Sequence, residues 1–197
     1  MTRLFACCLA LSLAPSLARA DRTLPIVVHV AERAGKPVAD AQFIADRIAR
    51  TNEIYAPYQI RFEVLAERPL AETHARMETR ADRDALGAEV SRGAIDCFIV
   101  ESLRDVDEPD RVRRGVHWHS QTHPGAHFVI LSIIGGLDVL AHELGHFLGN
   151  PKHSEVAGNL MSYEHTEVLP FLDEAQQLNV RRALAGYLKR GELKLVR

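Results

Sequence analysis

The sequence predicts an α+β fold, in which a twisted mixed β-sheet packs against helices and a small helical part closes the chain. Three observations predict it: a strand–helix–strand order over residues 24–65, two short strands before a histidine-rich helix, and a last amphipathic helix near the C-terminus. The chain has 197 residues, of which 47% are hydrophobic and 25% charged. This size and composition are those of one globular domain.

The first three elements differ in their hydrophobic period. Leu24–Ala31 is apolar and β-branched, which is typical of a strand buried on both faces. Apolar residues then recur every three or four positions, so we expect an amphipathic helix over Val38–Tyr55 that ends before Pro57. Tyr58–Leu65 alternates polar and apolar residues, as a half-buried strand does.

The later elements are shorter, and no repeat or composition shift divides the chain. The expected order is a loop with a short helix near Arg83–Val90, a strand Ala94–Val100, an exposed loop Asp105–Arg114, strands Gly115–His119 and His127–Ser132, a helix Leu137–Leu148, an irregular segment Gly149–Tyr163, and a helix Leu172–Leu188 capped by Asp173. We therefore expect a single domain over residues 21–197.

Residues 1–20 have the pattern of a signal peptide. Arg3 precedes an apolar run that ends at Pro15, and Ala18-Arg19-Ala20 offers small residues at a cleavage site. The run is too short to span a bilayer. We expect cleavage after Ala20, export to the periplasm or the extracellular space, and no stable membrane insertion.

The charge of the chain argues against nucleic-acid binding, and its cysteine content argues against a disulfide-stabilised fold. The formal net charge of −2 becomes −4 when the signal peptide and its two arginines are removed, so there is no basic excess for binding nucleic acid. The same cleavage removes Cys7 and Cys8, and Cys97 alone can form no intramolecular disulfide. Cys97 lies in an apolar strand and is expected to be a buried small hydrophobe.

The most informative segment is His142-Glu143-Leu144-Gly145-His146, within the expected helix 137–148. Two histidines four residues apart lie on one helix face, so both can reach a zinc ion at about 2.0–2.1 Å. Glu143 lies beside them and can accept a proton from water. Five residues alone also fit a core helix with two hydrogen-bonded histidines. Three further residues favour a metal site: Gly149, which can end the helix in the left-handed conformation, His153 beyond that turn, and the apolar Met161 in a short later segment.

The pattern H-E-x-x-H-x-x-G, a histidine past the glycine, and the downstream Leu160-Met161-Ser162-Tyr163 resemble the metzincin clan of zinc endopeptidases. The order of elements is similar to that of compact bacterial members related to pappalysin and cytophagalysin. The resemblance implies a metzincin-like zincin fold, one catalytic zinc ion and a peptide or protein substrate. It also implies roles for individual residues: zinc ligands His142, His146 and His153, general base Glu143, Met-turn residue Met161, and Tyr163 as a zinc ligand or oxyanion stabiliser, as in astacin-like and serralysin-like members.

The sequence departs from the clan pattern at the third ligand. The pattern places a histidine three residues after the glycine, where this chain has Lys152, and His153 follows one residue later. A gluzincin-type site would instead take a glutamate from a later segment, and the candidates are Glu164, Glu167 and Glu174. His153 is favoured because Gly149 and Met161 both belong to the metzincin arrangement.

A second group of histidines, His117, His119, His123 and His127, precedes the motif. It predicts either a second metal site or an edge strand that pairs with an extended peptide. The simpler interpretation places His117 and His119 on one strand face, with Trp118 in the core. His29 and His74 stand alone and are expected to be structural or solvated.

These patterns predict a secreted zinc endopeptidase. A different class of function, a zinc-stabilised binding or adaptor protein without turnover, fits the same metal site.

Overall fold

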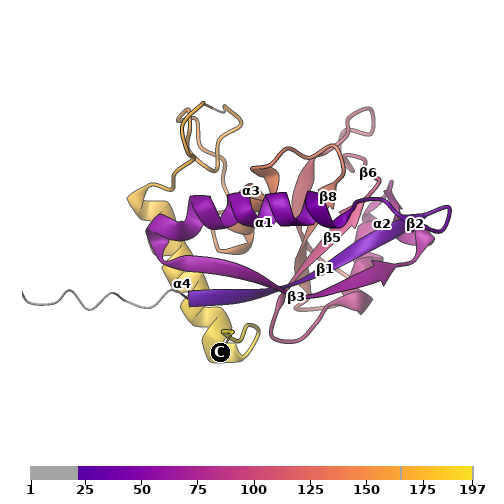
Figure 1. Cartoon of the computed structure of the whole chain (residues 1–197), viewed down its shortest axis with the longest axis horizontal. Coiled ribbons are helices and arrows are strands. Elements are labelled where there is room, and N and C mark those ends of the chain that lie inside the picture. Colours follow the sequence, from indigo (N-terminus) through magenta and orange to yellow (C-terminus); the bar gives the residue numbers. More distant parts are fainter. Residues whose placement is uncertain (1–21, 165, 197) are drawn as a thin grey trace, which may run out of the picture.

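A twisted sheet of mixed strand direction forms the centre of the structure (Figure 1). The computed structural model describes residues 22–164 and 166–196, so the expected signal peptide lies outside the described residues. The sheet order is β3 (Ile60–Leu70), β1 (Arg22–Arg33), β5 (Ile95–Val100), β8 (His127–Ser132) and β7 (Gly115–His119), and β2 (Lys36–Pro37) pairs with the end of β1. The pairs β3–β1, β1–β5 and β5–β8 are parallel, whereas β7 is antiparallel to β8. Strand β7 is therefore an edge of this sheet.

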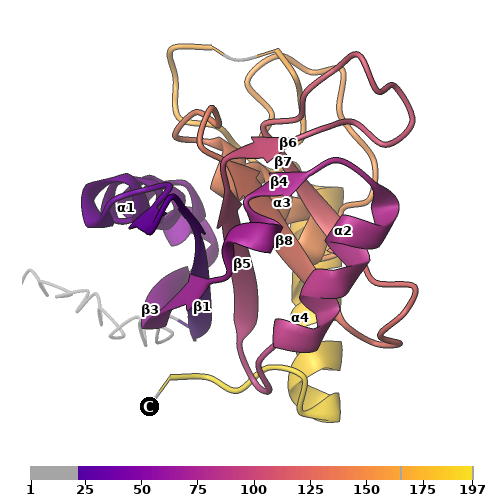
Figure 2. The ribbon, with the colours of Figure 1, turned by 90° about the vertical axis from the view of Figure 1, so that its right-hand side faces the viewer.

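Helices and short elements complete the described chain. The α-helices are α1 (Ala41–Tyr55), α2 (Arg80–Ala85), α3 (Val139–Phe147) and α4 (Glu174–Arg190). The 3₁₀ turns are η1 (Ala56–Tyr58), η2 (Glu72–His74) and η3 (Leu86–Glu89). A separate short pair is formed by β4 (Arg76–Met77) and β6 (Ser102–Leu103), which are parallel. Figure 2 shows α1 and α2 on opposite sides of β1 and β5. No helix among the described residues has the length and apolar character needed to cross a bilayer.

The sheet separates two hydrophobic cores. In β5, Cys97 and Ile99 join the core built with α1, α3 and α4, whereas Phe98 and Val100 join the core under α2 and η3. Strands buried on both faces read as continuous apolar runs, which is why β1 and β5 were recognisable. Cys97 is buried as expected, and burial raises the pKa of its thiol to about 12.

Most expected elements are present, with shifted ends. Helix α1 begins at Ala41 because the side chain of Asp40 accepts the backbone N–H of Phe43. Helix α4 follows the expected cap at Asp173, which forms a capping box with Gln176. The short helix expected near Arg83–Val90 begins earlier, since Thr79 caps α2, and it continues only as a 3₁₀ turn.

Candidate metal centre and active site

Helix α3 holds its motif rigidly against the core. Leu140, Ala141 and Leu144 are buried on its inner side, and the hydroxyl of Tyr55 in α1 donates a hydrogen bond to the carbonyl of Ala141 at 3.1 Å. His142 and His146 are half-buried on the side that faces a cleft of about 920 Å³. The helix therefore presents both imidazoles from a fixed backbone, as the four-residue spacing predicts.

The chain reverses after α3 at Gly149. Its φ of +95° lies in the left-handed region, as expected, and its N–H bonds to the carbonyl of His146 at 3.1 Å. A Cβ at this position would lie 3.1 Å from the Cβ of Ala183 in α4. The positive φ therefore favours glycine at this turn, and the absence of a Cβ also lets α4 pack closely.

The turn brings His153 to the two helix histidines. Its Nε2 lies 3.2 Å from Nε2 of His146, and the ligand atoms of His142, His146 and His153 all lie within 4.8 Å of one another. Nitrogens at about 2.0–2.1 Å from a tetrahedral ion are separated by about 3.3 Å. The extra residue after Gly149 is therefore accommodated in the turn, and the three imidazoles fit a zinc ion.

Hydrogen bonds from the outer ring nitrogens orient two of these imidazoles. Nδ1 of His142 bonds to the carbonyl of Leu160, and Nδ1 of His146 bonds to the carbonyl of Asn150, both at 2.7 Å. Such bonds fix the tautomer in which Nε2 carries no proton, as a metal ligand requires. Burial lowers the pKa of His146 and of His153, which favours the neutral form that metal binding requires.

The glutamates considered as alternative ligands do not join this cluster. Among the described residues, two groups of at least three ligating side chains converge, and both consist of histidines alone. Neither group contains Glu164, Glu167 or Glu174.

Glu143 lies in the same cleft with only 6% of its surface exposed. Burial raises the pKa of its carboxyl to about 8, against the opposing effects of a hydrogen bond from the backbone of His117 and the charge of Arg113. Strand β7 comes very close here, because a Cβ on Gly115 would lie 2.9 Å from Cγ of Glu143. The edge strand and α3 together fix this carboxylate beside the histidines.

Met161 is fully buried and packs against Gly145 of α3, the residue before His146. A Cβ on Gly145 would overlap the Met161 sulfur. The backbone also holds this segment, since the N–H of Ser154 donates to the carbonyl of Met161 at 2.8 Å. The segment expected to form a Met-turn therefore packs directly against the histidine helix.

We expect Gly145→Ala to destabilise the protein by about 1–3 kcal/mol, the usual cost of overpacking a core. The matched control is Gly186→Ala in α4, where the new Cβ meets only the flexible end of Arg190 and should stabilise by about 0.5–1 kcal/mol. Urea unfolding of both variants measures the difference. Equal effects of the two substitutions would contradict the packing of Met161 on α3.

Two further side chains complete the cleft wall. The hydroxyl of Tyr163 lies 3.4 Å from Nδ1 of His153 and also hydrogen-bonds the side chain of Arg113. Arg113 was expected only in a solvated loop, but Asp105 draws that loop inward. Backbone N–H groups of Asp107 and Glu108, together with Arg113, lower the pKa of the Asp105 carboxyl to about 2. An Asp side chain that accepts the backbone N–H groups two and three residues later is typical of such a turn, so the aspartate itself was the local signal.

The second group of histidines divides in the structure. His117, His119 and His127 converge, whereas His123 bonds to Ser120 and Thr122 in the hairpin loop. Trp118 is buried on the opposite face of β7, as expected, and donates to Asp84 at 2.8 Å. His29 is structural, because it is buried and pairs with Asp96 at 2.8 Å.

No protein-family model and no curated protein sequence matches this chain. Solved structures with a similar fold include archaemetzincin from Methanopyrus kandleri, with a TM-score of 0.55 and 16% identity over 83% of this chain and 96% of that chain. Mature mirolysin of Tannerella forsythia, solved with a cleaved peptide, gives a TM-score of 0.55 and 12% identity over 89% of this chain and 100% of that chain.

Metalloproteinase-II from Bacteroides fragilis gives a TM-score of 0.56 and 15% identity. The match covers 86% of this chain and 55% of the longer metalloproteinase chain. At these identities the likeness is one of fold. The chain therefore has the mixed α+β fold that these zincin-like metallopeptidases share, as the sequence predicts.

Proposed function

We propose that this chain is a secreted zinc-dependent endopeptidase of the metzincin type. The observation that carries the proposal is the convergence of His142, His146 and His153 beside the buried carboxylate of Glu143 in one cleft. The fold shared with zincin-like metallopeptidases, one of them solved with a cleaved peptide, supports it. Its export rests on the signal-peptide pattern of residues 1–20.

His142, His146 and His153 would hold the zinc ion. Bound zinc supplies a Lewis acid that polarises a carbonyl group and brings the pKa of water to about 7. Three protein ligands leave one position open, which is the arrangement of catalytic rather than structural zinc sites.

Glu143 is the general base of the proposed reaction. It accepts a proton from the attacking water and passes it to the leaving amine. Its buried position makes the carboxylate more basic than an exposed one, and the backbone of His117 holds it in place. A carboxylate that is both fixed and basic suits repeated proton transfer.

Tyr163 and Arg113 are the candidates for stabilising the oxyanion. The phenol of Tyr163 lies at the rim of the cleft and is 64% exposed, so it can reach a substrate carbonyl. Its hydrogen bond to Arg113 favours donation of a further bond to a developing negative charge.

The free edge of β7 is the natural place for an extended peptide. Its residues Val116, His117 and Trp118 line the cleft, and β8 occupies only one of its two edges. An exposed edge binds a peptide by main-chain hydrogen bonds, as an added strand. A peptide bound along β7 would pass between this strand and the histidine cluster.

Digestion of a mixed peptide library by the purified protein tests the proposed function. We expect cleavage products in the mass spectrum, their loss after treatment with a zinc chelator, and their return on adding zinc. A protein that binds zinc through the three histidines but cleaves nothing would contradict the proposal and support the adaptor alternative.

A further inference from the structure

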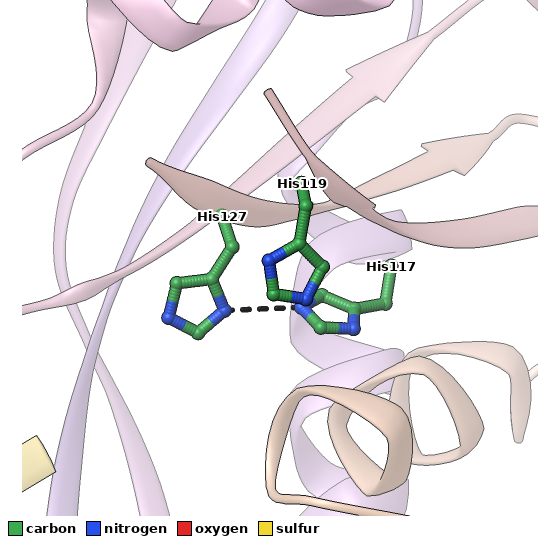
Figure 3. Close-up of side chains that lie close together, drawn as sticks. All are labelled: His117, His119 and His127. Carbon is green, nitrogen blue, oxygen red and sulfur yellow. Dashed lines mark hydrogen bonds between the residues drawn. The ribbon is translucent and has the colours of Figure 1, made fainter. Parts of the chain in front are cut away.

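Three histidines that do not belong to the α3 cluster point their rings toward one another across the β7–β8 hairpin (Figure 3). We propose that His117, His119 and His127 form a second metal site, with zinc as the ion it takes. The site stands on geometry separate from that of the α3 cluster, so it does not depend on the proposed peptidase function.

Strand register places the three side chains on one face of the sheet. His119 lies directly opposite His127, and His117 is paired with Val129, two residues further along β8. Direct and diagonal cross-strand neighbours on one face are within reach of each other. Because the hydrogen bonds of the hairpin fix this register, the donors are held together before any ion binds.

The distances suit a small divalent ion. Nε2 of His117 lies 3.0 Å from Nδ1 of His127, and one nitrogen from each of the three rings lies within 4.8 Å of the others. This spread matches that of the α3 cluster, whose ligand atoms also lie within 4.8 Å of one another and in which Nε2 of His146 lies 3.2 Å from Nε2 of His153. Small rotations of the rings would bring the donors to the separation of about 3.3 Å expected around tetrahedral zinc.

The partial burial of the cluster also suits a metal site. His117 and His127 are half-buried, whereas His119 is exposed at the mouth of the site. Neutral imidazole, the form that burial favours, is the form that binds metals.

Aromatic side chains shape the inner wall of this site. His127 stacks on Phe147 of α3 with ring centroids 4.2 Å apart, and Tyr187 of α4 contacts the same ring. Such an apolar wall holds the imidazoles in orientation and keeps water from the inner side. His117 and His119 line the cleft itself, so a fourth ligand would approach from the cleft.

The donor set selects the class of ion. Three imidazoles without a carboxylate suit zinc, copper or nickel rather than calcium or magnesium, which take oxygen ligands. Three protein ligands also leave a coordination position for water or for a substrate group. His117 further connects the two clusters, since its backbone bonds to the carboxylate of Glu143 while its side chain belongs to the second triad.

Metal stoichiometry of tag-free protein tests the site. Each variant is stripped with a chelator, titrated with zinc, dialysed and measured by mass spectrometry, and Co²⁺ substitution reports tetrahedral sites in the visible spectrum. We expect two ions per chain in the parent protein and one in His119→Ala, whose exposed side chain can be removed without disturbing the core. His123→Ala, a histidine of the same hairpin outside the triad, is the matched control and should keep two ions.

A second pair of variants separates this site from the proposed active site. The double variant His142→Ala with His146→Ala should retain one ion, and adding His119→Ala should remove it. One ion in both the parent and His119→Ala, with none in the double variant, would overturn the second site and leave the first intact. One ion in the double variant that depends on His119 would uphold the second site whatever the outcome of the peptidase assay.

Discussion

Glu143→Gln should reduce peptide hydrolysis by about 10²–10⁴-fold, the usual contribution of a general base, while zinc content stays at the parent level. The substitution keeps the size of a side chain that is almost fully buried between α3 and β7. The amide can still accept the hydrogen bond from the backbone of His117, but it cannot take up a proton. The loss should therefore appear in kcat rather than in metal binding or folding.

The measurement combines steady-state kinetics on a peptide found in the library digest with zinc analysis of the same preparations. Glu155→Gln, an exposed carboxylate two residues after His153, is the matched control and should cleave at the parent rate. Hydrolysis by Glu143→Gln at the parent rate would remove Glu143 from the reaction. Loss of zinc from this variant would instead assign the carboxylate a ligand role.

Most of the geometry of the candidate site could be predicted from the sequence because its parts are local. His142, Glu143 and His146 occupy one helix whose period could be recognised, and the left-handed turn at Gly149 has a glycine because few other residues adopt it. Gly115–His119 and His127–Ser132 were likewise predicted with the bounds that the structure shows. These segments are short and strongly patterned, so local rules were sufficient.

Contacts between distant segments could not be predicted in this way. The role of Arg113 depends on the buried turn at Asp105 and on Tyr163, fifty residues later in the chain. The meeting of His117, His119 and His127 depends on hairpin register, and their burial depends on Phe147 and Tyr187 from two helices. Strand β3 likewise extends beyond Leu65 to Leu70 because β1 pairs with it along its length, which the alternating pattern alone does not reveal.

The second large expected effect is the loss of zinc when His153, the proposed third ligand, is removed. His153 follows Gly149 by four residues, one more than in the metzincin pattern. The His119→Ala variant, which lacks the proposed second site, should hold one zinc ion and serves as the background for this test. Adding His153→Ala should reduce that content to well below one ion per chain after dialysis. Removing a residue that only supports a ligand costs about 10–100-fold in affinity, and loss of a ligand itself should cost more.

Three further variants in the same background, Glu164→Gln, Glu167→Gln and Glu174→Gln, test the glutamate alternative and should all retain the ion. The geometry gives the reason, since Nε2 of His153 lies 3.2 Å from Nε2 of His146 and no glutamate joins that cluster among the described residues. Retention of zinc by His153→Ala together with its loss from one glutamate variant would reverse the assignment.

Because Tyr163 stacks on His153 with ring centroids 4.3 Å apart, Tyr163→Phe should keep both the stack and the zinc. Metal loss confined to His153→Ala would therefore identify the imidazole as the ligand and exclude a general disturbance of the turn.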